Sequence, residues 1–172
     1  MGNSYLKKVG RWDIAGLMTR NIGRDIPIEL AVALKQVGLQ GEKMMKKYII
    51  EQKGESASGD YKWKELDKAY LFRKGADGYS TKTLIRTSTM VQSISSQSIY
   101  PKVFIGVKRG VAQEDGQDVA NIAAIMEFGS QKRNIPARKF IAPVGEDLQM
   151  QITEQNLFGQ KILKYLRKKY GL

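Results

Sequence analysis

The sequence predicts an α+β fold: a small antiparallel sheet packed by a long N-terminal helix and a C-terminal helix, in a single domain. Three patterns predict it, namely an amphipathic stretch over residues 27–50, an alternating stretch over residues 99–108, and apolar residues at helical spacing after Gly145. The chain has 172 residues, enough for one domain with a substantial core. Mixed helices with few strands are typical of an antiparallel sheet covered by helices on one face.

The N-terminal part divides into an arm and a helix. Residues 1–26 are basic and turn-rich, and we expect an arm that packs on the body or on a neighbour, with a flexible terminus as the alternative. Residues 27–172 then form the α+β domain. Pro27 suits the first position of a helix, which should run to Ile50. Gly38 and Gly41 weaken that helix by roughly 1 kcal/mol each relative to Ala, so we expect a close helix contact or a bend there.

The middle of the chain contains the clearest strand. Residues 51–62 are polar and rich in Gly and Ser, which predicts a loop, and residues 63–80 continue irregularly. Residues 83–94 have apolar side chains at helical spacing, which predicts a helix. Residues 99–108 alternate between two faces and predict a strand, with Pro101 near its start.

The last third is predicted to be mainly helical. Residues 109–118 should form a loop, residues 119–128 a short helix and residues 138–142 a strand. A C-terminal helix should follow Gly145, with Gly159 as a candidate interruption.

Composition narrows the chemistry. The chain has no Cys and no His, which removes thiolate chemistry, the commonest general base and the commonest metal ligand. We expect no enzyme activity, no metal and no cofactor. No apolar run is long enough to span a membrane and no signal peptide is recognisable, so we expect a protein made and kept in the cytoplasm, or in a particle assembled there. The net charge of +12 favours nucleic acid or an acidic protein surface as partner, although Lys-rich helix faces can also serve solubility alone.

Residues 122–144 form the most informative stretch. An apolar segment ends in Glu127-Phe128-Gly129, a basic loop over residues 130–134 follows, and Ile135-Pro136 leads back into apolar sequence. Gly129 suits a helix C-terminus at positive φ, and Pro136 limits the flexibility of the loop. The pattern predicts a shaped connector that docks. Its candidate interface residues are Glu127, Phe128, Gly129, Arg133, Ile135, Pro136, Arg138 and Phe140. We expect the Glu127 carboxylate to brace the loop or an interface, with Arg133 or Arg138 as candidate partners.

This stretch resembles the virion-morphogenesis, or tail-completion, proteins of tailed bacteriophages, which are neck proteins of the head–tail junction. Three further stretches resemble the same family in the same order: residues 63–66 (Trp-Lys-Glu-Leu), the basic segment 68–74, and residues 83–94. The resemblance covers roughly residues 28–143. The chain departs from the usual pattern at four positions, with Ser88 for Gly, Met90 for Leu, Met126 for His and Lys139 for Pro.

The resemblance implies a structural virion protein, a subunit of a neck or tail-completion ring of six or twelve copies that joins head and tail. It implies partners such as portal adaptor, head-closure or tail-terminator proteins, DNA passing through the lumen, and a place in the virion after assembly in the host cytoplasm.

Two other functions compete with this one, namely nucleic-acid binding and nuclease activity. The alternative is a basic nucleic-acid-binding protein without catalytic activity. Against it, Tyr100, Phe104, Phe128 and Phe140 occur in patterns typical of a core rather than of a stacking surface. A nuclease ranks last, because the acidic residues lack a recognisable spacing for metal-assisted phosphoryl chemistry.

The C-terminal end carries a second candidate site. Its basic residues can complement the helix dipole or contact DNA or an acidic partner. They are Lys161, Lys164, Arg167, Lys168 and Lys169.

Overall fold

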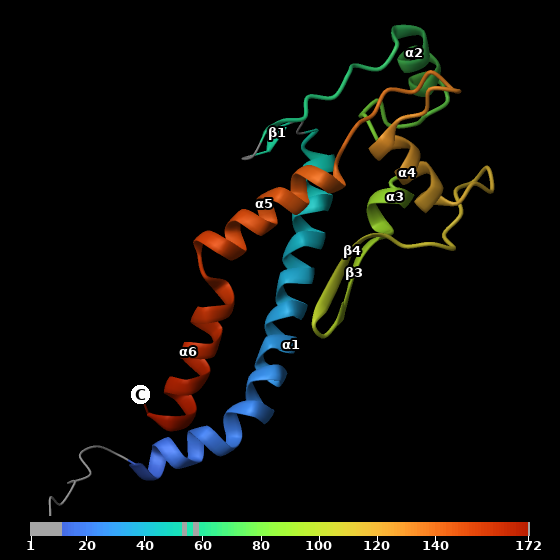
Figure 1. Ribbon diagram of the computed structural model, residues 1–172. Helices are drawn as coiled ribbons and strands as arrows, with labels where there is room; N and C mark the ends of the chain where they lie inside the picture. The colour runs from blue at the N-terminus through green and yellow to red at the C-terminus, as the bar shows by residue number, and fades with distance from the viewer. Residues whose placement is uncertain (1–11, 53–54, 57–58, 172) are drawn as a thin grey trace, which may run out of the picture.

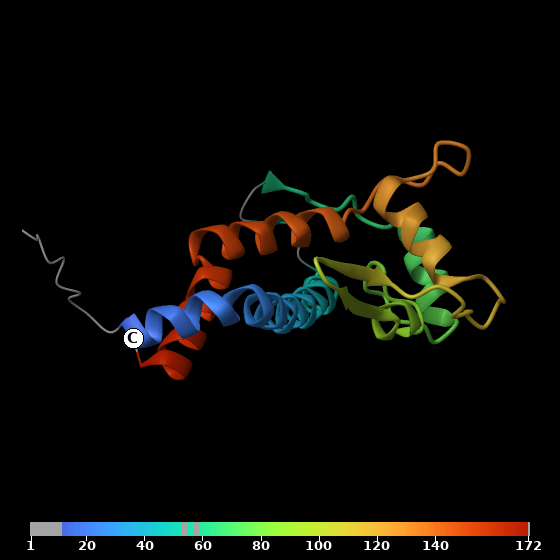
Figure 2. The same ribbon diagram turned by 60° about the horizontal axis from the view of Figure 1, so that its bottom comes forward.

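The computed structural model describes residues 12–52, 55–56 and 59–171, and these form an α+β domain organised along one long helix, α1 (Trp12–Ile50) (Figure 1). At 1.5 Å per residue, the 39 residues of α1 span about 58 Å. A hairpin packs on one side of α1, and the last two helices pack along another (Figures 1 and 2).

The expected helix start at Pro27 is wrong, because α1 begins at Trp12. Residues 12–26, expected to be turn-rich, are therefore helical, whereas residues 1–11 of the expected arm lie outside the described residues. A proline inside a helix removes one backbone hydrogen bond and bends the chain. α1 does change direction within its N-terminal half, the half that contains Pro27 (Figure 1).

The sheet on α1 is a hairpin of β3 (Ile94–Ile99) and β4 (Lys102–Val107), paired antiparallel. The predicted strand over residues 99–108 is thus β4, and Pro101 lies in the turn before it. The predicted helix over residues 83–94 is mostly wrong, since only α3 (Thr89–Gln92) is helical. Ser88 has a left-handed φ of 62°, which prevents a regular helix from crossing it, and Ile94 instead pairs with Val107.

Two glycines let the hairpin and the C-terminal helices approach α1. A Cβ on Gly38 would lie 2.9 Å from Cγ2 of Val103 in β4. A Cβ on Gly41 would collide with Ile105 of β4 and would lie 2.9 Å from Cδ2 of Leu148. The close contact predicted from these glycines is confirmed, although the hairpin provides most of it.

Short elements precede and follow the hairpin. The expected loop over residues 51–62 contains a two-residue pairing of β1 (Glu55–Ser56) with β2 (Gly59–Asp60). The segment expected to be irregular contains α2 (Lys68–Ala76), whose N-terminus is capped by Asp67. The predicted short helix is confirmed as α4 (Val119–Phe128), with Asp118 accepting a 2.8 Å hydrogen bond from the Ala120 amide.

The C-terminal part consists of α5 (Ile141–Glu154) and α6 (Leu157–Tyr170). The predicted strand over residues 138–142 is wrong, because α5 begins inside it. The predicted interruption occurs, but at Asn156 with a φ of 45° instead of at Gly159, which lies inside α6. Both helices pack on α1, and Gln40 donates a 2.7 Å hydrogen bond to Gln151 between α1 and α5.

The core lies where the C-terminal half of α1 meets α3, the hairpin and the start of α5. Its most deeply buried side chains include Met45, Ile49, Ile94, Phe140 and Val144. Among the described residues, no helix combines the length and apolarity that crossing a membrane requires.

Candidate functional site

The predicted connector is a stiff loop, and we call residues 129–140 the braced loop. The two sides of the loop are joined by a pair of backbone hydrogen bonds. The Ser130 amide donates to the Ile135 carbonyl at 2.8 Å, and the Ile135 amide donates to the Ser130 carbonyl at 2.9 Å. The tip between them, which includes Arg133, is exposed. The loop projects from the α2 and α4 end of the molecule (Figure 2).

Gly129 is required at the base of the braced loop for two reasons. Its φ of 76° is disfavoured for residues with a side chain. A Cβ at this position would also lie 2.9 Å from the backbone nitrogen of Ala137 and 3.0 Å from the carbonyl oxygen of Ile135. The positive φ predicted from the sequence is confirmed.

The Glu127 side chain connects the end of α4 to the C-terminal end of the braced loop. Its carboxylate is buried and accepts hydrogen bonds from the amides of Phe140, Ile141 and Ala142 at 2.8, 2.9 and 3.0 Å. These amides belong to the first turn of α5 and its cap, where a negative charge also complements the helix dipole. Loop bracing by Glu127 is confirmed, but pairing with Arg133 or Arg138 is absent among the described residues.

A second segment, residues 63–66, supports the loop from the other side. The indole Nε1 of Trp63 donates to the Lys139 carbonyl at 2.8 Å, and Nε of Arg138 donates to the Lys64 carbonyl at 3.2 Å. The Arg138 amide also donates to the Met126 carbonyl at 2.6 Å. The loop is therefore tied to α4, to α5 and to residues 63–64. The sequence placed Trp63 in a recognisable stretch but gave no sign of this contact.

The eight predicted interface residues do not share one environment. Phe140 is fully buried in the core, so it anchors the loop and cannot contact a partner. Glu127 and Arg138 are also buried, whereas Ile135 and Pro136 are half-buried. Arg133 and Phe128 are exposed, and Phe128 is 81% accessible.

An open groove of about 1200 Å³ runs beside the braced loop. Residues 64–74, residues 83–90, α4 and the loop form its walls. Lys74 lies buried in the wall and donates to the carbonyls of Lys82 and Ile85 at 2.8 and 2.6 Å. Burial, followed by the nearby charge of Arg86, lowers the pKa of Lys74, and burial lowers the pKa of Arg138. No sequence pattern distinguishes Lys74 from exposed lysines.

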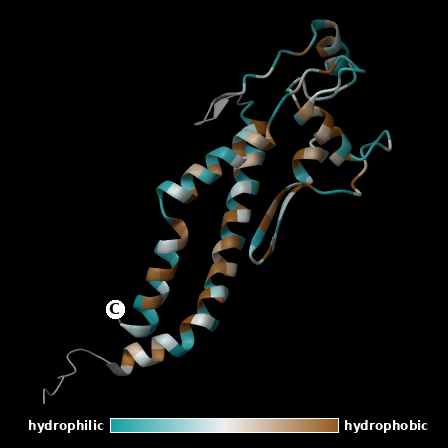
Figure 3. Cartoon of the chain, viewed as in Figure 1, coloured by the Kyte–Doolittle hydropathy of each residue, from teal (hydrophilic) through white to brown (hydrophobic). Residues whose placement is uncertain are grey.

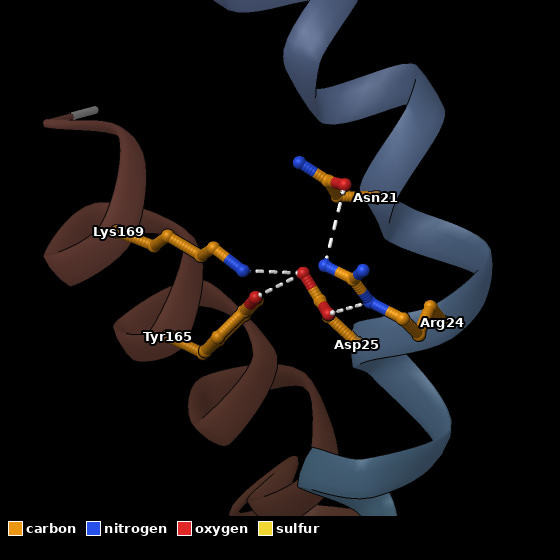
Figure 4. Close-up of polar contacts among 5 residues, drawn as sticks. All are labelled: Asn21, Arg24, Asp25, Tyr165 and Lys169. Atoms are coloured by element: carbon orange, nitrogen blue, oxygen red, sulfur yellow. Dashed lines mark hydrogen bonds and ion pairs between the residues drawn. The ribbon is translucent and has the colours of Figure 1, made fainter.

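The basic C-terminal end lies at the opposite end of the molecule (Figure 1). There α6 is fastened to α1 by a cluster that we call the α1–α6 latch, made of Arg24, Asp25, Tyr165 and Lys169 (Figure 4). Lys169 and the Tyr165 hydroxyl both donate to one carboxylate oxygen of Asp25, while Arg24 donates to the other at 3.0 Å. The hydrogen bond from Lys169, followed by those from Tyr165 and Arg24, holds the pKa of Asp25 well below its usual range.

The five basic residues predicted for this end therefore divide into two groups. Lys169 forms a salt bridge with Asp25 and so holds α6 against α1. Lys161, Lys164 and Lys168 line a shallow hollow of about 480 Å³ beside Glu29 of α1, and Arg167 is exposed. In the described part of the chain, no group of three or more acidic residues is placed to hold a metal ion.

Comparison with known proteins identifies one relative. No family model matches the chain, and no solved structure matches it. The uncharacterized protein MJ0331 of Methanocaldococcus jannaschii is 32% identical over 114 residues, which are 63% of this chain and 73% of the archaeal protein. The chain therefore belongs to the same family as the uncharacterized protein MJ0331.

Proposed function

We propose that the protein is a structural subunit of a phage neck or tail-completion ring, which joins head and tail. One observation carries the proposal. The four stretches that resemble this family come from two parts of the sequence, residues 63–94 and residues 122–144, and residues from each stretch line the groove beside the braced loop. Shared family patterns that converge on one surface are expected where that surface binds a partner.

The braced loop suits such a role. Its shape is set by Gly129, by Pro136 and by the Glu127 bonds, so docking costs little conformational entropy. Figure 3 shows hydrophobic residues in the ribbon of α4, and at the end of this helix the Phe128 side chain is 81% exposed, as that of Phe72 in α2 is 79% exposed. Such exposed apolar side chains are typical of subunits that are covered by neighbours.

A ring of six or twelve copies needs a heterologous interface, in which one patch meets a different patch on the next copy. The braced loop provides one side of it, and portal adaptor, head-closure or tail-terminator proteins are the neighbouring rings. The exposed lysines of α6 face DNA in the lumen or an acidic neighbour. The protein then resides in the virion after assembly in the host cytoplasm.

Electron microscopy of the purified protein tests the ring directly. Arg133→Glu is the preferred interface variant, because Arg138 is buried and Arg138→Glu would damage the fold. Lys35→Glu on α1 makes the same charge change at another exposed site and serves as the control. We expect closed rings for the wild type and the control, and fewer for Arg133→Glu. Monomers at every protein concentration would exclude the ring.

One observation favours the second candidate, a basic nucleic-acid-binding protein. Tyr100 and Phe104 are about half exposed, so the expectation that they belong to the core is wrong, as it is for Phe128. Phe104 shares the outward face of β4 with Lys102, and exposed aromatic side chains beside cations can stack on bases. Binding of single-stranded DNA that weakens steeply with salt and is lost in Phe104→Ala would support this candidate over the first.

A further inference from the structure

Two cations in the wall of the groove have no carboxylate partner in the part of the chain that the structure describes. Arg138 and Lys74 are each only 6% exposed. Their hydrogen bonds go to backbone carbonyls, one from Arg138 and two from Lys74. Among the described residues, neither forms a salt bridge. Burying an unpaired charge is costly, so such a pair of cations is expected where a charge arrives from outside.

The guanidinium of Arg138 has one edge free. Nε is taken by the Lys64 carbonyl, and no residue in the described part of the chain accepts a hydrogen bond from either Nη atom. The two Nη groups of an arginine present parallel N–H donors that match the two oxygens of a carboxylate. Arg138 is therefore oriented by the protein, and it lines the groove from which an acidic group would approach.

The acidic residues around the groove are engaged elsewhere or lie at its rim. Asp67 caps α2 by accepting a hydrogen bond from the Tyr70 amide. Asp115 pairs with Arg86 at 3.4 Å. Glu65 is exposed. None of the three compensates the charge on Arg138 or Lys74.

The remaining wall of the groove is largely apolar. Its side chains come from the 83–90 turn, from α4 and from the loop, and they include Leu84, Ile85, Met90, Ile125, Met126 and Pro136. A suitable occupant therefore combines apolar side chains with a carboxylate. The phosphates of a nucleic acid backbone are met mainly by exposed Lys and Arg, whereas these two cations are buried.

We propose that the groove binds an acidic, apolar segment of another protein, with an Asp or Glu carboxylate paired to the Nη edge of Arg138 and drawn in by Lys74. The inference rests on the proposed function in one respect only: that function makes the bound protein another component of the particle. The pairing itself follows from charge complementarity between the occupant and two buried cations.

Fluorescence anisotropy with defined probes tests the pairing on the full chain at physiological salt. The probes are a labelled short peptide of alternating Glu and Leu, its counterpart with Gln for Glu, and a single-stranded DNA of the same charge. We expect the Glu peptide to bind about tenfold more tightly than the Gln peptide. Arg138→Gln should weaken binding of the Glu peptide about tenfold. Arg20→Gln removes the same charge from an exposed position on α1 outside the groove, and it should weaken binding less than about threefold.

Stability measurements separate recognition from a structural role. Arg138→Met removes a buried unpaired charge but also the hydrogen bond to the Lys64 carbonyl, and these two effects on stability oppose each other. Its melting temperature should therefore stay close to or above that of the wild type while peptide binding is lost. A markedly lower melting temperature in this variant would identify Arg138 as a structural residue and overturn the proposal. The proposal would also be overturned if the Glu and Gln peptides bound equally tightly, or if the two Gln variants weakened peptide binding equally. It would be overturned as well if only the DNA bound and Arg138→Gln weakened that binding. Ring formation is scored separately by microscopy, so failure of the pairing and failure of the ring remain distinguishable.

Discussion

The α1–α6 latch and the groove use buried charge in opposite ways. In the latch, the Asp25 carboxylate receives hydrogen bonds from Lys169, Tyr165 and Arg24. In the groove, the side chains of Arg138 and Lys74 donate to backbone carbonyls and, within residues 12–52, 55–56 and 59–171, pair with no carboxylate. Substituting a buried charge that is paired lowers the stability of the fold, because its partner is left without a counter-charge. Substituting a buried charge that has no counter-charge does not carry this loss. The difference suggests that one end of the molecule is fastened and the other is prepared for a partner.

The largest expected effect is at the base of the braced loop. Gly129→Ala should cost about 3 kcal/mol or more, because a left-handed φ is combined with a collision against the Ala137 backbone. Gly110→Ala is the matched control, since Gly110 has a φ of 78° but no neighbour within 4 Å of the added Cβ. It should cost only about 1 kcal/mol. Urea unfolding measures both, and equal losses would mean that the loop is not tightly braced.

The next effect concerns Glu127, the buried carboxylate at the groove end, which accepts three backbone hydrogen bonds. Glu127→Gln replaces one acceptor oxygen by an NH₂ group that faces amides, and it should cost about 2 kcal/mol. Glu65→Gln makes the same change at an exposed position and should alter the free energy of unfolding by less than about 0.5 kcal/mol. Similar values for the two variants in urea unfolding would contradict the capping role.

The latch should respond to pH. Asp25→Asn lowers the melting temperature at neutral pH, since the three donors lose their carboxylate. The pKa of Asp25 is held below its ordinary value of about 4, chiefly by the Lys169 hydrogen bond. Its stabilisation is therefore complete above that pH and disappears as the pH falls towards the lowered pKa. Melting curves of variant and wild type should converge in acid, and a constant gap would rule out this origin.

The smallest contrast lies between two neighbouring lysines. Lys169→Gln should lower the melting temperature modestly, because Lys169 pairs with Asp25. Lys168→Gln should leave it unchanged, because Lys168 is exposed and forms no salt bridge with a described residue. The hydrogen bond to Asp25 raises the pKa of Lys169, so its contribution is present below about pH 10 and is lost as the pH rises through the raised pKa. Equal melting temperatures of the two variants at neutral pH would remove Lys169 from the latch.

Local signals predicted the structure best. The end of α4 was predicted from Gly129, which lies next to the helix, whereas the cap that Asp118 provides at its start was found only in the structure. The predicted helix start at Pro27 is wrong because α6 packs on α1, and this contact extends the helix on the N-terminal side of the proline. The helix over residues 83–94 failed because Ile94 pairs with Val107 across the hairpin, a non-local interaction that overrides helical spacing.

The candidate site was predicted in outline. Residues 127–140 were identified as a shaped loop, and the bracing role of Glu127 was foreseen. Its partners were not, because residue spacing does not show which donors a carboxylate will accept from when backbone amides compete with arginines. The burial of Lys74 and Arg138 depends on segments that meet only in the folded chain, and no pattern in one sequence reports it.

The two ends also differ in how much chain must be organised before they can form. The Glu127 bond to the Phe140 amide closes only 13 residues, whereas the bond from Lys169 to Asp25 joins positions 144 residues apart. The entropy lost on closing a loop grows with its length, and local contacts form early in folding. The α4–α5 corner can therefore assemble while the rest of the chain is still unfolded. We expect the latch, in contrast, to form later, because its residues come from the two ends of the domain.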